Sequence, residues 1–314
     1  MNRVAFVFPG QGSQKLGMGS DLVNNFNLAR RTFEEASDSA GINLLNLCTQ
    51  GPIEELNRTE MTQPALLTAG MAAYRVLVSE TDIRPDYVAG HSLGEFTAVT
   101  AADGFVLADA VQLVRKRGQY MQEAVPEGEG AMAAILGMEL QELKEICDEV
   151  GGLVVPANLN CPGQIVISGE KTAVEDVAEL SRERGAKRAM LLPVSVPSHS
   201  PLMKPVCRRL KEALEGVVIR DLSVPLVGNV GARAIRTTEE IREELISQLI
   251  SPLRWEESVR ELVSRGVETF IELGPGKVLS NLISRIQQDI QILNLEDLEG
   301  LKVIQQAAKG REVE

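Results

Sequence analysis

The pentapeptide Gly-His-Ser-Leu-Gly at residues 90–94 constrains the fold of this chain more than any other segment. A short apolar run at residues 87–89 precedes it, and residues 95–102 have the composition of a helix. A serine between two glycines, at a sharp turn from strand to helix, is the pattern of a nucleophile elbow. The hydroxyl then projects over the end of the sheet, where the first helical N–H groups stabilise an oxyanion. Ser92 is therefore a candidate nucleophile, and the alternative is a surface serine in a small-residue turn.

Strand-like and helix-like segments alternate along most of the chain, and this alternation predicts an α/β fold with a mostly parallel sheet. The apolar run at residues 4–8 predicts the first strand, and residues 61–79 and 109–124 predict long helices. Beyond residue 201 the alternation resumes, with predicted helices at 202–215, 239–250 and 277–286 and predicted strands at 224–227, 269–273 and 290–293.

A segment in the middle of the chain has a different order of elements. Strand, helix, strand, strand, helix, strand is the arrangement of a ferredoxin-like α+β unit. We therefore expect a small domain at residues 128–197, inserted into a large domain made of residues 1–127 and 198–314. Its predicted strands are 131–136, 153–157, 164–168 and 188–194, and its predicted helices are 139–150 and 173–184.

The composition is that of a globular chain with a sizeable core, because 44% of the residues are hydrophobic and 24% are charged. No apolar run is long enough to predict a membrane span, and the N-terminus lacks a secretory signal pattern. We therefore expect a cytoplasmic protein. No pair of cysteines has the Cys-x-x-Cys spacing, so neither a disulfide framework nor a metal site is predicted. The four cysteines are Cys48, Cys147, Cys161 and Cys207.

The net charge of −12 disfavours binding to nucleic acids and to acidic membranes. An acidic partner would need a local basic patch, and two clusters of cationic residues are candidates for one. Each cluster taken alone is better explained as a solvated helix face. The first cluster consists of Arg182, Arg184, Lys187 and Arg188, and the second of Lys204, Arg208, Arg209 and Lys211.

A glycine-containing loop at residues 8–14 follows the first predicted strand but does not fit a nucleotide-binding pattern. A dinucleotide fingerprint needs glycine or alanine where Lys15 stands, and a Walker loop needs Gly-Lys-Ser/Thr at a spacing that is absent. The loop at residues 274–277 lacks the spacing as well. The backbone N–H groups of the first loop could instead serve an oxyanion, and otherwise the loop is a plain tight turn.

Ser92 needs a base, because a serine hydroxyl is a weak nucleophile until a neighbouring group takes its proton. The chain has only two histidines. His91 adjoins Ser92 in the elbow, where neighbouring side chains usually point apart. His199 lies where the chain returns from the predicted insertion, a place where clefts often form. His199 is therefore the candidate base, and the sequence assigns no acidic third member.

Two polar residues stand on apolar helix faces. Arg117 lies within the apolar stripe of the predicted helix at 109–124, where an isolated guanidinium is costly and needs an anionic partner. Either a structural ion pair or bidentate capture of a substrate carboxylate would supply that partner. Gln248 shares a helix face with Ile241 and Leu245, where a core amide bonded to the backbone is the simpler interpretation.

Together these segments resemble the malonyl-CoA:acyl carrier protein transacylases of fatty-acid synthesis, and the resemblance spans nearly the whole chain. No single motif would suffice, whereas their combination is specific. The motifs are Phe-Pro-Gly-Gln-Gly-Ser-Gln at 8–14, Thr-Gln-Pro-Ala at 62–65, Gly-His-Ser-Leu-Gly-Glu at 90–95, Arg-Gly at 117–118, the stretch 158–163, Val-Pro-Ser-His at 196–199 and Glu-Leu-Gly-Pro-Gly-Lys at 272–277.

The resemblance implies a hydrolase-like α/β core with a mostly parallel sheet, an inserted ferredoxin-like domain, and an active site in the groove between them. It implies a ping-pong reaction in which Ser92 accepts a malonyl group from malonyl-CoA and His199 acts as the base. The thiol of holo acyl carrier protein would then take the malonyl group. The reaction would use no metal and no redox cofactor, and the basic clusters gain weight as a docking surface for the acidic carrier.

The resemblance also implies roles for four further residues. The backbone N–H groups of Gln11 and Leu93 would form the oxyanion hole. Arg117 would bind the malonyl carboxylate. A main-chain carbonyl near Gln248, rather than a carboxylate, would steady the histidine, which would explain why no acid is assigned.

Three other functions are weighed against this one. A discrete acyltransferase serving a polyketide synthase would share the fold and the chemistry, although the segment at 196–199 is similar to the fatty-acid type. An acyl hydrolase would use water as the acceptor, but Arg117 on the pocket face disfavours simple neutral esters. A noncatalytic carrier-binding module would not need Ser92, His199 and Arg117 together. For the transacylase we expect a monomer.

Overall fold

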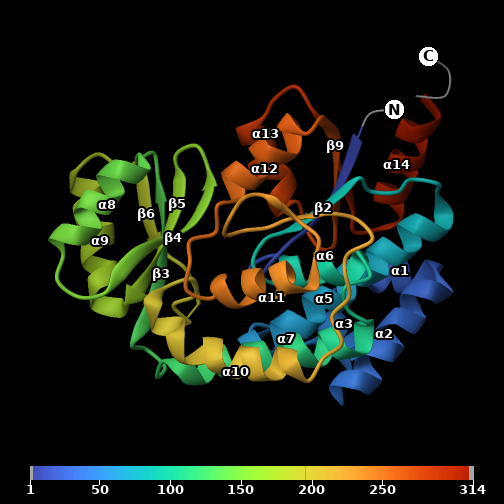
Figure 1. Cartoon of the computed structure of the whole chain (residues 1–314), viewed down its shortest axis with the longest axis horizontal. Coiled ribbons are helices and arrows are strands. Elements are labelled where there is room, and N and C mark those ends of the chain that lie inside the picture. Colours follow the sequence, from blue (N-terminus) through green and yellow to red (C-terminus); the bar gives the residue numbers. More distant parts are fainter. Residues whose placement is uncertain (1–2, 195, 311–314) are drawn as a thin grey trace.

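The computed structural model describes residues 3–194 and 196–310, which form two β-sheets with helices packed against them (Figure 1). The strands of the larger sheet are β1 (Arg3–Phe8), β2 (Tyr87–Gly90), β7 (Leu226–Val227), β8 (Ala234–Ile235), β9 (Val267–Leu273) and β10 (Gln291–Leu295). The strands of the smaller sheet are β3 (Gly130–Leu136), β4 (Val154–Cys161), β5 (Gln164–Glu170) and β6 (Arg188–Leu191).

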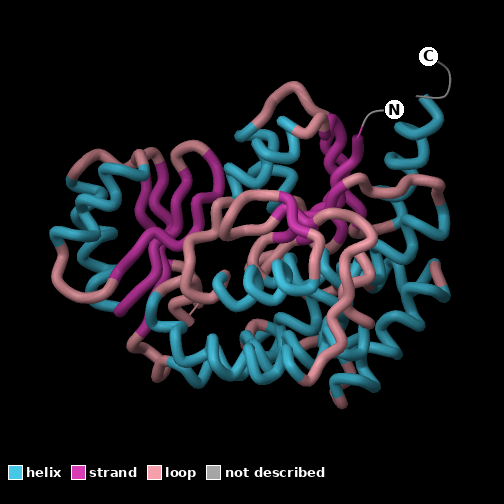
Figure 2. The backbone as a smooth tube through the Cα atoms, viewed as in Figure 1, coloured by secondary structure: helices cyan, strands magenta, loops and turns pink. Residues whose placement is uncertain are grey.

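Helices surround the larger sheet and cover one side of the smaller sheet (Figure 2). Within the described ranges, no helix is both long enough and apolar enough to cross a membrane. The helices that precede the smaller sheet are α1 (Ser20–Asn25), α2 (Asn27–Ala40), α3 (Leu44–Gln50), α4 (Ile53–Leu56), α5 (Thr59–Glu80), α6 (Leu93–Ala101) and α7 (Leu107–Ala124). The others are α8 (Leu140–Glu149), α9 (Lys171–Glu183), η1 (a 3-10 turn, Pro201–Met203), α10 (Lys204–Glu215), α11 (Thr238–Ser247), α12 (Trp255–Ser264), α13 (Val278–Ile286) and α14 (Leu298–Gly310).

The larger sheet has the order β10-β9-β1-β2-β7-β8, and all its pairings are parallel except that of β7 with β8. Side chains along β1 alternate between two cores, as successive residues of a strand must. Phe6 and Phe8 pack into the core formed with α2, α5 and α7, whereas Ala5 and Val7 pack into the core formed with α12 and α13. The sheet is therefore buried on both faces, as a parallel sheet requires.

The smaller sheet is antiparallel and has the order β4-β5-β3-β6. One face packs against α8 and α9. Met132, Ala134 and Val166 lie on the opposite face, beside the partly buried Leu192 and Val194. The chain order β3-α8-β4-β5-α9-β6 and the mostly parallel larger sheet confirm the predicted fold class. The domain boundaries, after residue 127 and before residue 198, stay a prediction.

Backbone hydrogen bonds join the smaller sheet to the rest of the molecule. The N–H of Leu159 in β4 donates to the carbonyl of Leu253 at 2.8 Å, and the N–H of Leu253 donates to the carbonyl of Ala157 at 2.8 Å. Leu253 lies in the connection from α11 to α12. The smaller sheet is therefore attached to the segment that immediately follows Gln248.

Two predicted elements end three residues earlier than expected, and both differences bear on the site. β6 ends at Leu191 instead of residue 194, and Leu192 and Val194 beyond its end line a pocket. α11 ends at Ser247 instead of residue 250, and Gln248 becomes its C-terminal cap. Among the described residues, α1 to α4, α12 and α14 are helices that the sequence analysis did not predict.

Candidate active site

Ser92 occupies the sharp turn between β2 and α6. Its backbone has a φ of 52° and a ψ of −106°, a conformation that residues with a side chain rarely adopt. Only glycine fits two positions before Ser92 and two positions after it. A Cβ on Gly90 would lie 2.0 Å from the carbonyl of Gly94, and a Cβ on Gly94 would lie 1.9 Å from the main-chain oxygen of Phe8. Strand and helix therefore pack closely around the serine, as a nucleophile elbow requires.

The hydroxyl of Ser92 contacts His199, which is 107 positions away in the chain. Oγ of Ser92 lies 2.9 Å from Nε2 of His199, and Nδ1 of the same ring lies 2.7 Å from the main-chain oxygen of Gln248. Because a carbonyl oxygen can only accept, Nδ1 carries the proton. The lone pair on Nε2 is thereby directed at the serine hydroxyl, which is the arrangement of a general base.

The surroundings of His199 keep its ring neutral. Burial is the main cause, and it lowers the pKa of His199 from 6.5 to about 3. The Arg117 cation and His91 lower it further, while the bond to the carbonyl of Gln248 acts in the opposite direction. The basic form of the imidazole therefore persists well below neutral pH.

Arg117 of α7 is fully buried and reaches the nucleophile. Nη2 lies 2.9 Å from Oε1 of Gln248 and 3.3 Å from Oγ of Ser92, and Nη1 donates to Oε1 of Gln63 at 2.9 Å. The ring of Phe96 lies 5.2 Å from the guanidinium carbon. Burial lowers the pKa of Arg117 to about 10, so that the group stays charged at neutral pH.

Within the described residues, Arg117 does not form the structural ion pair that the sequence left open. None of the ion pairs in the described part of the chain involves this side chain. Its hydrogen bonds go to neutral amide and hydroxyl oxygens, and its buried Nε has no hydrogen-bond partner in the part of the chain that the structure describes. The cation is therefore held in place but left without a counter-ion in contact, which favours the capture of an anionic ligand.

Gln248 contributes both its main chain and its side chain to the site. Its carbonyl accepts from His199, and its amide oxygen accepts from Arg117. Its amide nitrogen donates to the main-chain oxygen of Ser92 at 3.0 Å and to Oε2 of Glu95 at 2.6 Å. The sequence interpretation of Gln248 as a core amide was therefore incomplete. The side chain is buried as expected, but its hydrogen-bond partners include Arg117 and Glu95 as well as the backbone.

Glu95 and Asn229 complete this network, and the sequence analysis assigned a role to neither. The second oxygen of Glu95, Oε1, accepts from the N–H of Asn229 at 2.9 Å. The side chain of Asn229 in turn binds the N–H of Ser92 and the carbonyl of Gly90. Burial and the carboxyl of Glu244 raise the pKa of Glu95 well above its usual value, against the bonds from Asn229 and Gln248 and the Arg117 cation.

Gln11 and Leu93 line the same pocket as Ser92. Leu93 is the first residue of α6, and the N–H groups in the first turn of a helix have no partner within the helix. Gln11 follows β1, and its side chain donates to Oγ1 of Thr59 at 3.3 Å. Both residues therefore lie where backbone N–H groups could receive an oxyanion formed at Ser92.

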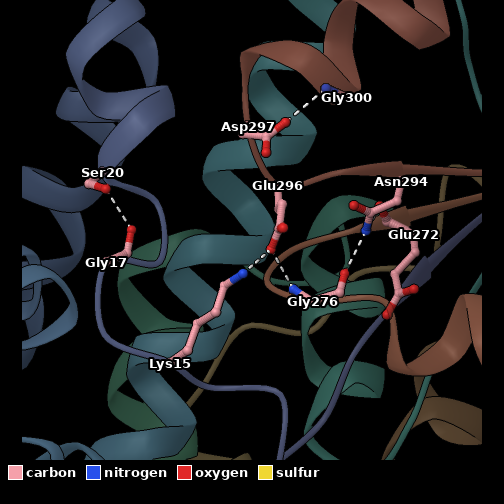
Figure 3. A network of polar contacts seen from close by, with 9 residues as sticks. All are labelled: Lys15, Gly17, Ser20, Glu272, Gly276, Asn294, Glu296, Asp297 and Gly300. Atoms are coloured by element: carbon pink, nitrogen blue, oxygen red, sulfur yellow. Dashed lines mark hydrogen bonds and ion pairs between the residues drawn. The ribbon is translucent and has the colours of Figure 1, made fainter.

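The loop that carries Gln11 is anchored by an ion pair at its end (Figure 3). The carboxylate of Glu296, just beyond β10, accepts from Lys15 at 2.8 Å and from the N–H of Gly276 at 2.7 Å. Gly276 belongs to the turn that follows β9, and this turn packs against Pro9 through Gly274. The turn at residues 274–277 therefore supports the loop that carries Gln11.

His91 points away from the nucleophile. Its Nε2 lies 2.9 Å from Oδ1 of Asn160 in β4, and its ring packs edge-on against Trp255 with centroids 5.8 Å apart. Burial lowers the pKa of His91, although the bond to Asn160 opposes the shift. His91 therefore links the elbow to the smaller sheet.

A pocket of about 90 Å³ opens in front of Ser92, between the two sheets. Two buried polar atoms of residues that line it, Nε of Arg117 and Oδ1 of Asn158, have no hydrogen-bond partner among the described residues. In the described part of the chain, no three His, Cys, Asp or Glu side chains are arranged to hold a metal ion. The pocket lining consists of Gln11, His91, Ser92, Leu93, Arg117, Met121, Met132, Asn158, Leu192, Val194, Val196, Ser198 and His199.

The two basic clusters lie on the surface, but several of their charges are paired. Arg184 forms an ion pair with Glu149, and Arg209 forms one with Glu123. Arg208 pairs with Glu212 one turn along the same helix. Lys204 and Lys211 are exposed on α10, and neither takes part in an ion pair within residues 3–194 and 196–310.

Comparison with known proteins fits this geometry. Residues 5–304 match the acyl transferase domain family. A malonyl CoA-acyl carrier protein transacylase of Bacillus subtilis (strain 168) is 49% identical over 312 residues, which cover 98% of each chain. The chain belongs to this family. The expected enzyme class, an acyltransferase, is thereby confirmed.

Solved structures of the family have the same fold. A malonyl-CoA:acyl carrier protein transacylase from Xanthomonas oryzae pv. oryzae superposes with a TM-score of 0.96 at 47% identity, with 98% of each chain covered. A malonyl-transacylase in complex with its type II PKS acyl-carrier protein gives a TM-score of 0.94 at 45% identity, covering 96% of this chain and 98% of that chain. The family fold therefore extends over nearly the whole chain.

Proposed function

We propose that this acyltransferase moves a malonyl group from malonyl-CoA to the phosphopantetheine thiol of holo acyl carrier protein, through an ester on Ser92. The observation that carries the proposal is the buried Arg117 cation, which has no ion-pair partner in the described residues and lies 3.3 Å from Oγ of Ser92. Such a cation matches an acyl group that ends in a carboxylate. The names of the relatives, which state malonyl and carrier protein, support the same assignment.

The first half-reaction uses the contacts around His199. Nε2 of His199 takes the proton of the Ser92 hydroxyl, and Oγ attacks the thioester carbon of malonyl-CoA. The N–H groups of Gln11 and Leu93 bind the oxyanion, while Arg117 binds the malonyl carboxylate. The carbon–sulfur bond then breaks, and the imidazolium returns its proton to the sulfur of coenzyme A.

The second half-reaction repeats these steps in reverse. The thiol of the carrier gives its proton to His199, and its sulfur attacks the malonyl ester. The ester bond breaks, and the proton returns to Oγ of Ser92. No step needs a metal ion or a redox cofactor, because the acyl group enters and leaves as a thioester. We keep a monomeric, cytoplasmic enzyme as a prediction.

A carrier protein of polyketide synthesis is the second candidate for the acceptor. A relative at 45% identity is described in complex with a type II PKS acyl-carrier protein. The chemistry at Ser92 would be the same in both pathways. The two acceptors are therefore distinguished by comparing the rates of malonyl transfer to purified carriers of each kind.

The test of the proposed function is intact-mass measurement after incubation with malonyl-CoA or acetyl-CoA. We expect a malonyl adduct that Ser92→Ala abolishes and that holo carrier protein removes. A malonyl adduct on Ser92→Ala would overturn the assignment of the nucleophile. Loss of the adduct to water at the same rate with and without carrier would instead identify an acyl hydrolase.

A further inference from the structure

The side-chain amide of Gln248 is held in one orientation by hydrogen bonds at both ends. Its oxygen accepts from Nη2 of Arg117 at 2.9 Å, and its nitrogen donates to Oε2 of Glu95 at 2.6 Å. All three side chains are buried. Arg117 and Glu95 are therefore connected through a single amide, which presents an acceptor to the cation and a donor to the carboxylate.

An amide rotated by half a turn has nearly the same shape but exchanges its donor and acceptor ends. In the rotated state the NH₂ group of Gln248 would face the guanidinium of Arg117, which also offers only donors. The buried cation would then lose one of its acceptors. Something must disfavour this state if Arg117 is to keep its position beside Ser92.

Glu95 disfavours the rotated state because both of its oxygens already accept N–H donors. Oε2 accepts from Gln248, and Oε1 accepts from the N–H of Asn229. When the Glu95 carboxyl is ionised, an amide oxygen turned toward Oε2 would place two acceptors in contact without a proton between them. The proposed mechanism gives Glu95 no part in the bond changes, although it lies one helical turn after Ser92.

We propose that Glu95 is a positioning residue, which fixes the amide of Gln248 and through it the guanidinium of Arg117 for acyl groups that carry a carboxylate. The inference rests on the proposed function, because it takes Arg117 as the carboxylate-binding group. The inferred role of Glu95 concerns the selectivity of the enzyme between acyl groups. Acetyl transfer makes no demand on the position of Arg117 as a carboxylate ligand, so it depends less on Glu95.

Glu95→Gln tests this step with almost no change in shape. A carboxylate accepts with two oxygens, whereas a carboxamide accepts with one and donates with the other end. Whichever way the new amide lies, it places a donor against either the N–H of Asn229 or the amide of Gln248. In the second case Gln248 turns, and Arg117 loses its acceptor.

Glu244→Gln is the matched control. Glu244 is a partly buried carboxyl whose pKa is also raised by burial, and its Oε1 accepts from the N–H of Val230 at 2.6 Å. That bond lies one residue along the chain from the Asn229 bond to Glu95. The N–H of Gln248 donates to the main-chain oxygen of Glu244 at 2.9 Å, a bond that Glu244→Gln keeps. In the described residues no hydrogen bond joins the Glu244 carboxyl to the Gln248 amide, so we expect the substitution to leave the amide orientation unchanged.

The readout is competition between malonyl-CoA and acetyl-CoA for Ser92, measured as the ratio of the two adducts on one preparation. This ratio does not depend on how much of the variant is folded. We expect Glu95→Gln to lower the malonyl-to-acetyl ratio about tenfold, because one hydrogen bond to a charged group is lost. Glu244→Gln should stay within about twofold of the native ratio.

A double substitution locates the effect. In an Arg117→Ala background, Glu95→Gln should leave the ratio unchanged, because the residue through which it acts is gone. Gln248→Met, which removes the amide but keeps the main-chain carbonyl for His199, should reproduce the fall seen with Glu95→Gln. Gln248→Met also tests the role of the amide if the Glu95→Gln variant does not fold.

The outcomes separate the inference from the function on which it rests. If the native enzyme forms no malonyl adduct, the proposed function fails. If the native enzyme prefers malonyl and Glu95→Gln keeps that preference, the positioning role is wrong. An equal effect of Glu95→Gln with and without Arg117 would also overturn it.

Discussion

Nη2 of Arg117 lies 3.3 Å from Oγ of Ser92, so a cation stands beside the nucleophile before any acyl group is bound. In a malonyl ester only one methylene separates the ester carbonyl from the carboxylate. A single guanidinium at this distance can therefore hold the carboxylate while the other end of the acyl group is bonded to Ser92. The group that selects the acyl chain and the group that attacks it are therefore in direct contact.

Replacing Arg117 by alanine should reverse the acyl preference. Truncating one partner of a buried charge pair costs about 2 kcal/mol or more, so malonyl transfer should fall at least thirtyfold. Acetyl transfer should be kept or gained. The measurement is kcat/KM for both thioesters, with Lys116→Ala, on the exposed side of the same helix, as the control. An unchanged preference would assign Arg117 a structural role.

The rate at which Ser92 is acylated should depend little on pH between 8 and 5. The base must be neutral, and burial lowers the pKa of His199 to about 3, so the active form persists throughout this range. A histidine with the usual value of 6.5 would be about 3% neutral at pH 5 and about thirtyfold slower. Single-turnover rates at saturating malonyl-CoA decide between these cases. A fall centred near pH 6.5 would contradict the expectation.

The same pKa shift predicts a loss of stability in acid. His199 takes up a proton near pH 6.5 when unfolded but only near pH 3 when folded, so the unfolded state binds more protons between these values. The free energy of unfolding therefore falls as the pH drops below 6.5. Relative to His199→Gln, the native protein should lose about 1 kcal/mol between pH 7.5 and 5.5. Denaturant titrations at the two pH values measure this difference, and equal changes would contradict it.

Ser92→Gly should make the protein more stable while it removes the nucleophile. The backbone of Ser92, with a φ of 52°, carries strain that glycine avoids. Ser92→Ala is the matched variant, since it also lacks the hydroxyl but keeps the Cβ. We expect the free energy of unfolding of Ser92→Gly to exceed that of Ser92→Ala by about 1 kcal/mol. This difference already allows for the greater freedom of glycine in the unfolded chain. Equal stabilities would show that the elbow is unstrained.

Charge reversal on α10 should weaken the use of carrier protein alone. Lys204→Glu and Arg208→Glu change exposed residues that we expect to meet an acidic partner. The KM for holo carrier should rise several-fold, and that for malonyl-CoA should not change. Lys302→Glu, on α14, is a control at another exposed lysine. An equal rise in both KM values would count against docking at this surface.

The sequence predicted the elements whose pattern is local. β1, α5 and α7 appear within a few residues of their expected bounds, because each has a continuous apolar strand or an extended helical stretch. The short helices α1, α3 and α4 were not predicted, since each has about two turns or fewer and is stabilised chiefly by packing on the rest of the chain. The longer helix α2 was missed as well. The early end of α11 at Ser247 was also beyond reach, because nothing in its composition distinguishes residues 248–250.

The site was predictable where chemistry narrowed the choice. With two histidines in the chain, Ser92 could be paired with His199 by elimination, and the two side chains do meet. Glu95 carried a usable signal, as the only charged residue of α6, a helix that is otherwise apolar or uncharged. Asn229 carried none, because its role depends on a loop 137 positions from Ser92.

The acceptor for the Nδ1 proton of His199 is a main-chain oxygen, that of Gln248. Every amino acid supplies such an oxygen, so no single codon change can delete this third member of the catalytic group. It can be lost only if the end of α11 moves. Natural sequence variation at position 248 would therefore alter the amide that faces Arg117 while the support of the base is inherited unchanged.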